Sequence, residues 1–182
     1  MIILGVDPGT VKIGYGIIKV VQGKSEVLGY NAINLNKSDP LSQRLKLMFR
    51  AISEVMDEYK PDVLSIETAF YGVNAQTALK LGHARGVIIL AAVERDIPIA
   101  EYSPREIKRA LVGNGNASKQ QVQYMIKTLL TLKTAPVGFD TTDALAVAMC
   151  HIHRSQKPAQ RFTSWKDFVT AHPEKIKERK KV

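Results

Sequence analysis

Cysteine is almost absent from this chain of 182 residues, since Cys150 is the only one. A single thiol excludes a disulfide framework and any zinc site built from several cysteines. This composition suits a reducing compartment. We therefore expect a cytoplasmic protein.

Long apolar runs are also missing. The longest, residues 87–93, is far shorter than the roughly 18 residues that a membrane span requires. The first residues carry no basic cluster and reach a carboxylate at Asp7, so they do not resemble a secretory signal peptide. These features favour a soluble protein with no membrane partner.

Internal repeats are absent as well, and the length fits one packed domain. The 45% content of hydrophobic residues is enough for a globular core. We predict one domain over residues 1–156, followed by a basic C-terminal tail over residues 157–182.

Positive charge is in excess, with 26 Lys and Arg against 17 Asp and Glu and a formal net charge of +9. Residues 105–133 hold six basic residues and one acid, and residues 157–182 hold eight basic residues and three acids. A near-neutral body with two basic segments is typical of a protein that binds a phosphate backbone. For any single basic residue, surface solubility is the simpler explanation. Our candidate nucleic-acid contacts in the first segment are Arg105, Lys108, Arg109 and Lys119.

Hydrophobic patterning predicts ten elements. The predicted strands are residues 2–6, 15–21, 26–35, 63–66 and 97–102, and the predicted helices are residues 40–59, 74–95, 104–113, 118–132 and 139–153. Three consecutive strands, then strands joined through helices, indicate an α/β fold. We expect a mixed five-stranded sheet, an antiparallel meander plus parallel strands, flanked by helices.

Four acids occupy positions that packing alone does not explain. Asp7 and Glu67 each follow a buried strand, while Asp140 and Asp143 are three apart near a helix start and share one face. A helix N-terminus favours negative charge, which accounts for Asp140 but for neither strand-end acid. Because clustered carboxylates repel each other, their convergence requires hard cations such as Mg²⁺ or Mn²⁺. Two such ions can activate water and stabilise the leaving oxygen of a phosphodiester.

Gly14 and Gly16 lie two apart on one face of the second predicted strand. The bare face has two interpretations of equal weight. It leaves room for a substrate or metal, or it accommodates a bulge or a bulky neighbour.

Four sequence motifs surround the acids, in order along the chain. They are Gly-Val-Asp-Pro-Gly-Thr at 5–10 with Gly-Tyr-Gly at 14–16, Ile-Glu at 66–67, Asn-Ala-Gln-Thr-Ala-Leu-Lys-Leu-Gly-His-Ala-Arg-Gly at 74–86, and Phe-Asp-Thr-Thr-Asp-Ala-Leu-Ala-Val-Ala at 139–148. In this combination, residues 3–156 resemble the RuvC family of bacterial Holliday-junction resolvases, within the ribonuclease-H-like nuclease superfamily.

The resemblance implies a homodimeric endonuclease that cuts two opposed strands of a four-way DNA junction symmetrically, in homologous recombination and DNA repair. It implies two Mg²⁺ ions per subunit, replaceable by Mn²⁺, with Asp7, Glu67, Asp140 and Asp143 as catalytic groups and metal ligands. Some relatives carry His where this chain has Asp140, so the ligand set of this chain consists of carboxylates alone. The family also works alongside a RuvA–RuvB branch-migration complex.

Lys108 and Lys119 fall where the family places phosphate-contacting lysines, with Lys119 nearer the scissile phosphate. Phe70 and Tyr71 follow Glu67 closely. Two adjacent aromatics in a loop cannot both be core, and one near the acids could stack on a base unpaired at the junction centre. Because the family has a stacking residue there, we favour Phe70 for this role.

The predicted helix at 74–95 carries a stripe of small and apolar residues at alternating spacings of four and three. The stripe consists of Ala75, Leu79, Gly82, Gly86, Ile89 and Val93. Neighbouring positions are apolar too, so this helix has two sides to bury. We expect the stripe to meet a second copy of the chain across a two-fold axis. The alternative is that the chain's own residues cover it.

Three other functions compete with this interpretation. A ribonuclease-H-like nuclease that matures ribosomal RNA is the nearest rival, but such relatives are generally shorter and lack the stretch at 78–86. A non-catalytic junction-binding protein would not need four intact acids. An actin-like kinase would need two such domains, and residues 113–119 lack the second glycine of a nucleotide-binding P-loop.

Overall fold

The computed structural model describes residues 1–68, 74–132 and 138–155, and all ten predicted elements are found there. The strands are β1 (Ile2–Asp7), β2 (Lys12–Val21), β3 (Lys24–Asn34), β4 (Val63–Glu67) and β5 (Ile99–Tyr102). The helices are α1 (Leu41–Tyr59), α2 (Ala75–Val93), α3 (Pro104–Val112), α4 (Lys119–Leu129) and α5 (Phe139–Ser155). The predicted order of strands and helices is therefore confirmed, with ends that shift by a few residues.

The five strands form one mixed sheet in the order β3-β2-β1-β4-β5. Strands β1, β2 and β3 pair antiparallel, whereas β4 pairs parallel with both β1 and β5. The β2–β3 hairpin turns at Gln22 and Gly23, whose φ angles of 51° and 77° suit a tight turn that follows the twist of the strands. The parallel pairs require crossover connections, which α1 and α2 supply.

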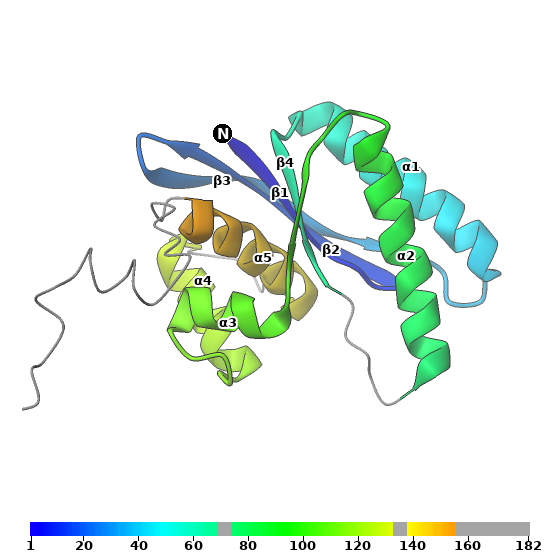
Figure 1. Ribbon diagram of the computed structural model, residues 1–182. Helices are drawn as coiled ribbons and strands as arrows, with labels where there is room; N and C mark the ends of the chain where they lie inside the picture. The colour runs from blue at the N-terminus through cyan, green and yellow to red at the C-terminus, as the bar shows by residue number, and fades with distance from the viewer. Residues whose placement is uncertain (69–73, 133–137, 156–182) are drawn as a thin grey trace, which may run out of the picture.

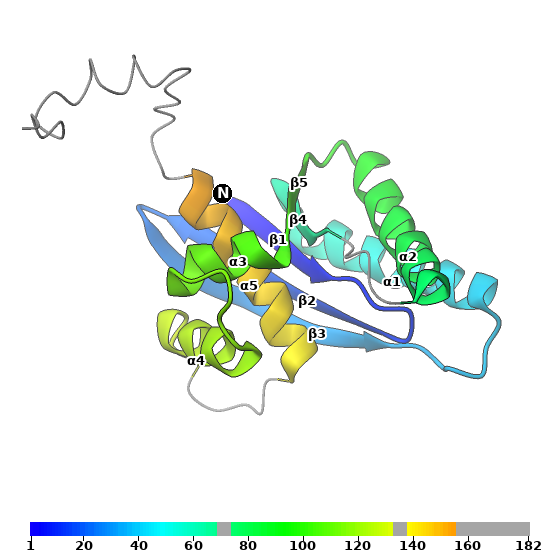
Figure 2. The same ribbon diagram turned by 60° about the horizontal axis from the view of Figure 1, so that its bottom comes forward.

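Helices cover both faces of the sheet, with α1 and α2 on one side and α3, α4 and α5 on the other (Figures 1 and 2). Alternation along β1 directs Leu4 and Val6 into the core under α1 and α2, and directs Ile3 into the core under α5. The expected flanked sheet is confirmed.

Helix α5 lies unusually close to β1 and β2 because glycines face it. A Cβ atom on Gly5 would meet the carbonyl oxygen of Ala144, and one on Gly14 would meet the carbonyl oxygen of Asp140. A Cβ atom on Gly16 would meet the Leu145 side chain. The bare face of β2 therefore accommodates a bulky neighbour, which decides between the two interpretations of these glycines. The close approach brings the start of α5 beside the end of β1.

Helix α2 buries only one of its two apolar sides within the described part of the chain. Ala84, Ile88, Ala91 and Ala92 face the core. The stripe lies on the other side, where Leu79 is 63% exposed. Apart from the neighbouring backbone of α2 itself, no described atom comes within 4 Å of a Cβ atom placed on Gly82 or Gly86. Of the remaining stripe residues, Ala75 and Val93 are exposed and Ile89 is half-buried.

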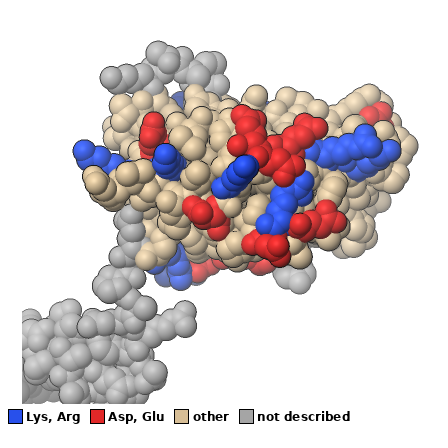
Figure 3. All heavy atoms as spheres, turned by 90° about the horizontal axis from the view of Figure 1, so that it is seen from above, with Lys and Arg blue, Asp and Glu red and all other residues tan. Residues whose placement is uncertain are grey.

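The surface shown in Figure 3 carries acidic and basic side chains side by side rather than a continuous basic patch. None of the described helices has an apolar stretch long enough to cross a bilayer.

Candidate active site

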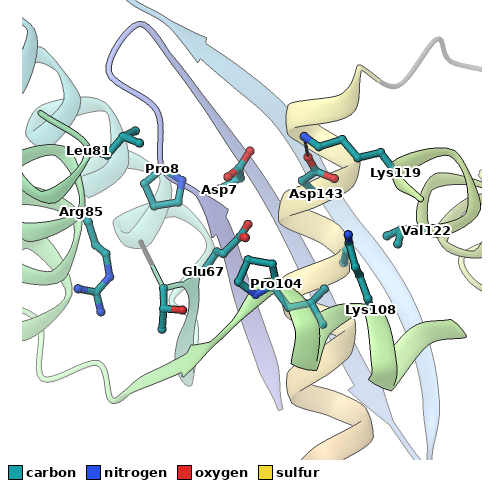
Figure 4. A pocket seen from close by; sticks show the side chains of 13 residues that line it. Asp7, Pro8, Glu67, Leu81, Arg85, Pro104, Lys108, Lys119, Val122 and Asp143 are labelled. Carbon is teal, nitrogen blue, oxygen red and sulfur yellow. Dashed lines mark hydrogen bonds and ion pairs between the residues drawn. The ribbon is translucent and has the colours of Figure 1, made fainter. Parts of the chain in front are cut away.

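Three of the four predicted acids share one cavity of about 480 Å³. Asp7 ends β1, Glu67 ends β4, and Asp143 lies in the second turn of α5. Their carboxylates turn toward a common space between α2 on one side and α3 and α4 on the other (Figure 4). The cavity is also lined by Pro8, Thr68, Leu81, Arg85, Pro104, Ile107, Lys108, Lys119, Val122 and Ala146. A cavity of this size can admit part of a nucleotide chain.

The parallel pairing of β1 with β4 explains why Asp7 and Glu67 meet. Val6 pairs with Ile66, so the residue after each projects from the same edge of the sheet. The turn that follows Asp7 is held by Arg44 of α1, which donates hydrogen bonds to the carbonyl oxygens of Thr10 and Asp39. Arg44 is itself buried. These contacts fix the backbone that presents Asp7.

Two capped helices supply the basic wall of the cavity. The Ser103 side chain accepts from the backbone N–H of Glu106, and the Ser118 side chain accepts from the backbone N–H of Gln121. In both cases the third helical residue bonds back to the capping residue, which completes a capping box. Helix α3 thereby presents Lys108, and α4 presents Lys119 as its first residue.

Burial and mutual repulsion act on the carboxyl groups in the cavity. Burial raises the pKa of Asp7 from 3.8 to about 7, helped by the charges of Glu67 and Asp143 and opposed by Lys119. The pKa of Glu67 also rises to about 7, again through burial and then through Asp143, with Lys119 and Lys108 opposing. Both acids therefore hold protons at pH values where exposed carboxyl groups have lost them.

Two lysines pair with the acids of α5. The Lys119 ammonium donates to Asp143 Oδ2 at 3.2 Å, and Asp143 raises the pKa of Lys119. The Lys12 ammonium lies 2.6 Å from Asp140 Oδ2. Asp140 is not among the residues that line the cavity, although its charge contributes to the raised pKa of Asp7. The fourth acid thus lies at the margin of the site.

The cavity has the donor chemistry of a hard-cation site. Its carboxylates supply oxygen ligands only, and the raised pKa values of Asp7 and Glu67 indicate negative charge that a cation would stabilise. Within the described ranges, no three acidic, His or Cys side chains converge closely enough to hold a metal ion as they stand. The residues therefore fit a divalent cation by chemistry, and the carboxylates would have to move toward it.

The structure separates the other predicted contact residues. Lys108 and Lys119 line the cavity, whereas Arg105 and Arg109 are exposed on α3 and do not line it. Phe70 and Tyr71 lie outside the described residues, as does the tail over residues 157–182.

Sequence reasoning missed two charged residues near the acids. Arg85 of α2 lines the cavity and forms an ion pair with Glu101 of β5, and its Nε atom is buried with no hydrogen-bond partner among the described residues. Lys12 pairs with Asp140. Arg85 lies in the motif at 74–86, but nothing in the sequence indicates that it lines this cavity. Lys12 precedes Gly14 by two residues, and no sequence signal indicates its partner.

Comparison with known proteins tests the resemblance. The family model described as crossover junction endodeoxyribonuclease RuvC matches residues 3–151. The chain belongs to the RuvC family. The RuvC of Christiangramia forsetii is 44% identical over 178 residues, which are 97% of this chain and 93% of that protein. The RuvC of Alkaliphilus metalliredigens is 48% identical over 153 residues, which are 84% of this chain and 93% of that protein.

Solved structures of RuvC proteins agree with this assignment. The structure of Thermus thermophilus RuvC superposes with a TM-score of 0.78 at 30% identity, covering 85% of this chain and 95% of that chain. The same protein in complex with a Holliday junction substrate gives a TM-score of 0.77 at 28% identity, with the same coverage. The predicted ribonuclease-H-like fold and the resemblance to RuvC are both confirmed.

Proposed function

We propose that this chain is a crossover junction endodeoxyribonuclease that resolves four-way DNA junctions in homologous recombination and repair. The proposal rests on one observation above all: three carboxylates from β1, β4 and α5 share a cavity with Lys108 and Lys119, in a member of the RuvC family. The Thermus thermophilus relative is described in complex with a Holliday junction.

The reaction we propose is hydrolysis of one phosphodiester per subunit with Mg²⁺ as cofactor. Asp7, Glu67, Asp140 and Asp143 would hold two Mg²⁺ ions, or Mn²⁺ in their place. Bound there, the ions would activate water and stabilise the leaving oxygen. Their charge would also offset the repulsion that raises the pKa of Asp7 and Glu67.

The chain's own residues position the substrate. Lys119 adjoins Asp143 at the cavity, so its ammonium can hold a non-bridging oxygen of the phosphate that is cut. Lys108 lies on the same wall and can hold an adjacent phosphate. Arg105 and Arg109 on the exposed face of α3 extend this basic surface along the bound DNA strand. We keep Phe70 as the stacking residue at the junction centre, with Tyr71 beside it.

A homodimer accounts for symmetrical, paired nicking. The exposed stripe of α2, with Ala75, Leu79, Gly82, Gly86 and Ile89 as contacts, is the surface we assign to the dimer. A two-fold axis there would give two cavities related by symmetry, one for each opposed strand. We also propose that the dimer works in the cytoplasm with a RuvA–RuvB complex, and that residues 1–156 form the nuclease domain and residues 157–182 a basic appendage.

A synthetic four-way junction and a linear duplex of the same sequence, incubated with Mg²⁺, test the proposed reaction. We expect wild-type protein to make paired nicks in the junction only. Asp7→Asn should reduce cleavage at least about 10²-fold, because it removes a ligand and a charge, while junction binding persists. Asp96→Asn makes the same chemical change on an exposed turn and should cleave like wild type.

Two results would contradict the proposal. Preferential cutting of RNA hairpins would favour the rival activity in RNA maturation. Binding of the junction without any cleavage in Mg²⁺ or Mn²⁺ would favour a non-catalytic junction-binding protein.

A further inference from the structure

Each acid of α5 has its own lysine partner, and the two pairs differ in their relation to the cavity. Asp143 and Lys119 both line it. Asp140 and Lys12 do not line it, although the Asp140 carboxylate is close enough to raise the pKa of Asp7. One α5 carboxylate is therefore in the site, and the other is held beside it.

Lys12 reaches Asp140 because of the local fold. It is the first residue of β2, and the close approach of α5 to Gly14 sets the backbone of Asp140 against this strand. The ammonium then lies 2.6 Å from Asp140 Oδ2. Gly138, just before α5, leaves open the space beside the ammonium.

We propose that Lys12 is an internal counter-ion that holds Asp140 aside in the cation-free protein and releases it when a divalent cation binds. The inference rests on the proposed function, in which Asp140 is a metal ligand. Lys12 is then a positioning residue: it neutralises Asp140 while the site lacks a cation, and the incoming ion replaces it. Lys119 stands in the same relation to Asp143.

The exposure of the Lys12–Asp140 pair makes such an exchange possible. The two side chains are 44% and 38% exposed, and solvent weakens an ion pair of this kind. A dehydrated, tightly paired lysine could not be displaced so readily, because breaking a buried pair leaves an uncompensated charge. Removing Lys12 should therefore strengthen cation binding modestly, by about two- to fivefold.

Titration of the DNA-free protein with Mn²⁺, with free ion measured by electron paramagnetic resonance, tests the inference without any readout of cleavage. We expect Lys12→Ala to bind Mn²⁺ two- to fivefold more tightly than wild type, and Asp140→Asn to bind it more weakly. In the double variant the gain from Lys12→Ala should disappear, since it acts through Asp140.

Lys19→Ala is the matched control. Lys19 is exposed on the same strand, but it pairs with Ile2 at the end of β1 remote from Asp7. Lys19→Ala removes the same charge as Lys12→Ala. An equal gain in Mn²⁺ affinity in this variant would therefore mean that Lys12 acts only through the net charge of the protein, and it would overturn the inference. Unchanged or weaker Mn²⁺ binding by Lys12→Ala would overturn it too.

The same titration separates this inference from the proposed function. If wild-type protein binds Mn²⁺ and Asp7→Asn protein does not, the result supports the proposed site whatever the effect of Lys12→Ala. Wild-type protein that binds no Mn²⁺ contradicts the proposed metal dependence, and the role of Lys12 falls with it.

Discussion

The carboxyl groups of Asp7 and Glu67 retain their protons more readily than exposed carboxyl groups, because burial and neighbouring acids disfavour their charged forms. A raised pKa in the folded protein means that the folded state binds more protons than the unfolded state between about pH 4 and pH 7. The stability that these groups contribute is complete below the unfolded pKa and is lost as pH rises through the folded pKa. At pH 8 the cation-free site is therefore a source of instability.

Asp7→Asn should remove this instability, since the amide cannot ionise. The shift in the pKa of Asp7 from 3.8 to about 7 limits the gain in unfolding free energy to about 4 kcal/mol. Because Asp7 is partly exposed, we expect a gain of about 2 kcal/mol at pH 8. At pH 5 the gain should be smaller, because wild-type Asp7 is then protonated. Denaturant unfolding in a chelator at both pH values measures the difference, and a variant less stable than wild type at pH 8 would contradict the account.

The glycines facing α5 give a second prediction at this scale. Gly5→Ala places a Cβ atom against the Ala144 carbonyl oxygen, so the helix must shift. We expect a loss of about 3 kcal/mol in unfolding free energy, as for an overpacked core. Gly138→Ala is the control, since its Cβ atom would make only an ordinary contact, 3.7 Å from the Lys12 Nζ atom. Equal effects of the two changes in denaturant unfolding would rule out close packing by α5.

At the scale of elements, the helix ends could be predicted because their signals are local. Asn74 accepts hydrogen bonds from the backbone N–H groups of Gln76 and Thr77, and Ser103 and Ser118 cap α3 and α4 together with the residue three positions after each. A cap needs only a few consecutive residues, so one sequence reveals it. The same holds for the strand-end acids, because each stands next to its own apolar run.

Contacts between elements could not be predicted in this way. The sequence shows that Gly14 lacks a side chain, but not that α5 fills the space. It shows the charges of Lys12 and Arg85, but not that they pair with Asp140 and Glu101. Such pairs depend on how α5 and α2 dock on the sheet, which is a property of tertiary packing and not of local pattern.

At the scale of the whole molecule, α2 carries the dimer proposal. Its stripe is exposed in the described part of the chain, and contiguous exposed apolar surface of this kind marks association sites. Leu79→Glu should change the intrinsic unfolding free energy of one subunit by no more than about 0.5 kcal/mol, since Leu79 is 63% exposed in the single chain. It should convert the protein from dimer to monomer at micromolar concentration, because a charge would face its symmetry mate.

Light scattering or sedimentation measures this change. Val21→Glu, at a position 49% exposed at the end of β2, is the control that should remain dimeric. Wild-type protein that is monomeric at micromolar concentration, or Leu79→Glu protein that stays dimeric, would contradict the assignment of this surface.

Location of the divalent ions in a crystal tests the central claim most directly. Anomalous diffraction from crystals soaked in Mn²⁺ should show density within roughly 2.5 Å of the Asp7 carboxylate and of Glu67 or Asp143, with the Lys119 ammonium moved away from Asp143. Absence of Mn²⁺ from the cavity at a concentration that supports junction cleavage in solution would show that these carboxylates are not the metal ligands of the reaction.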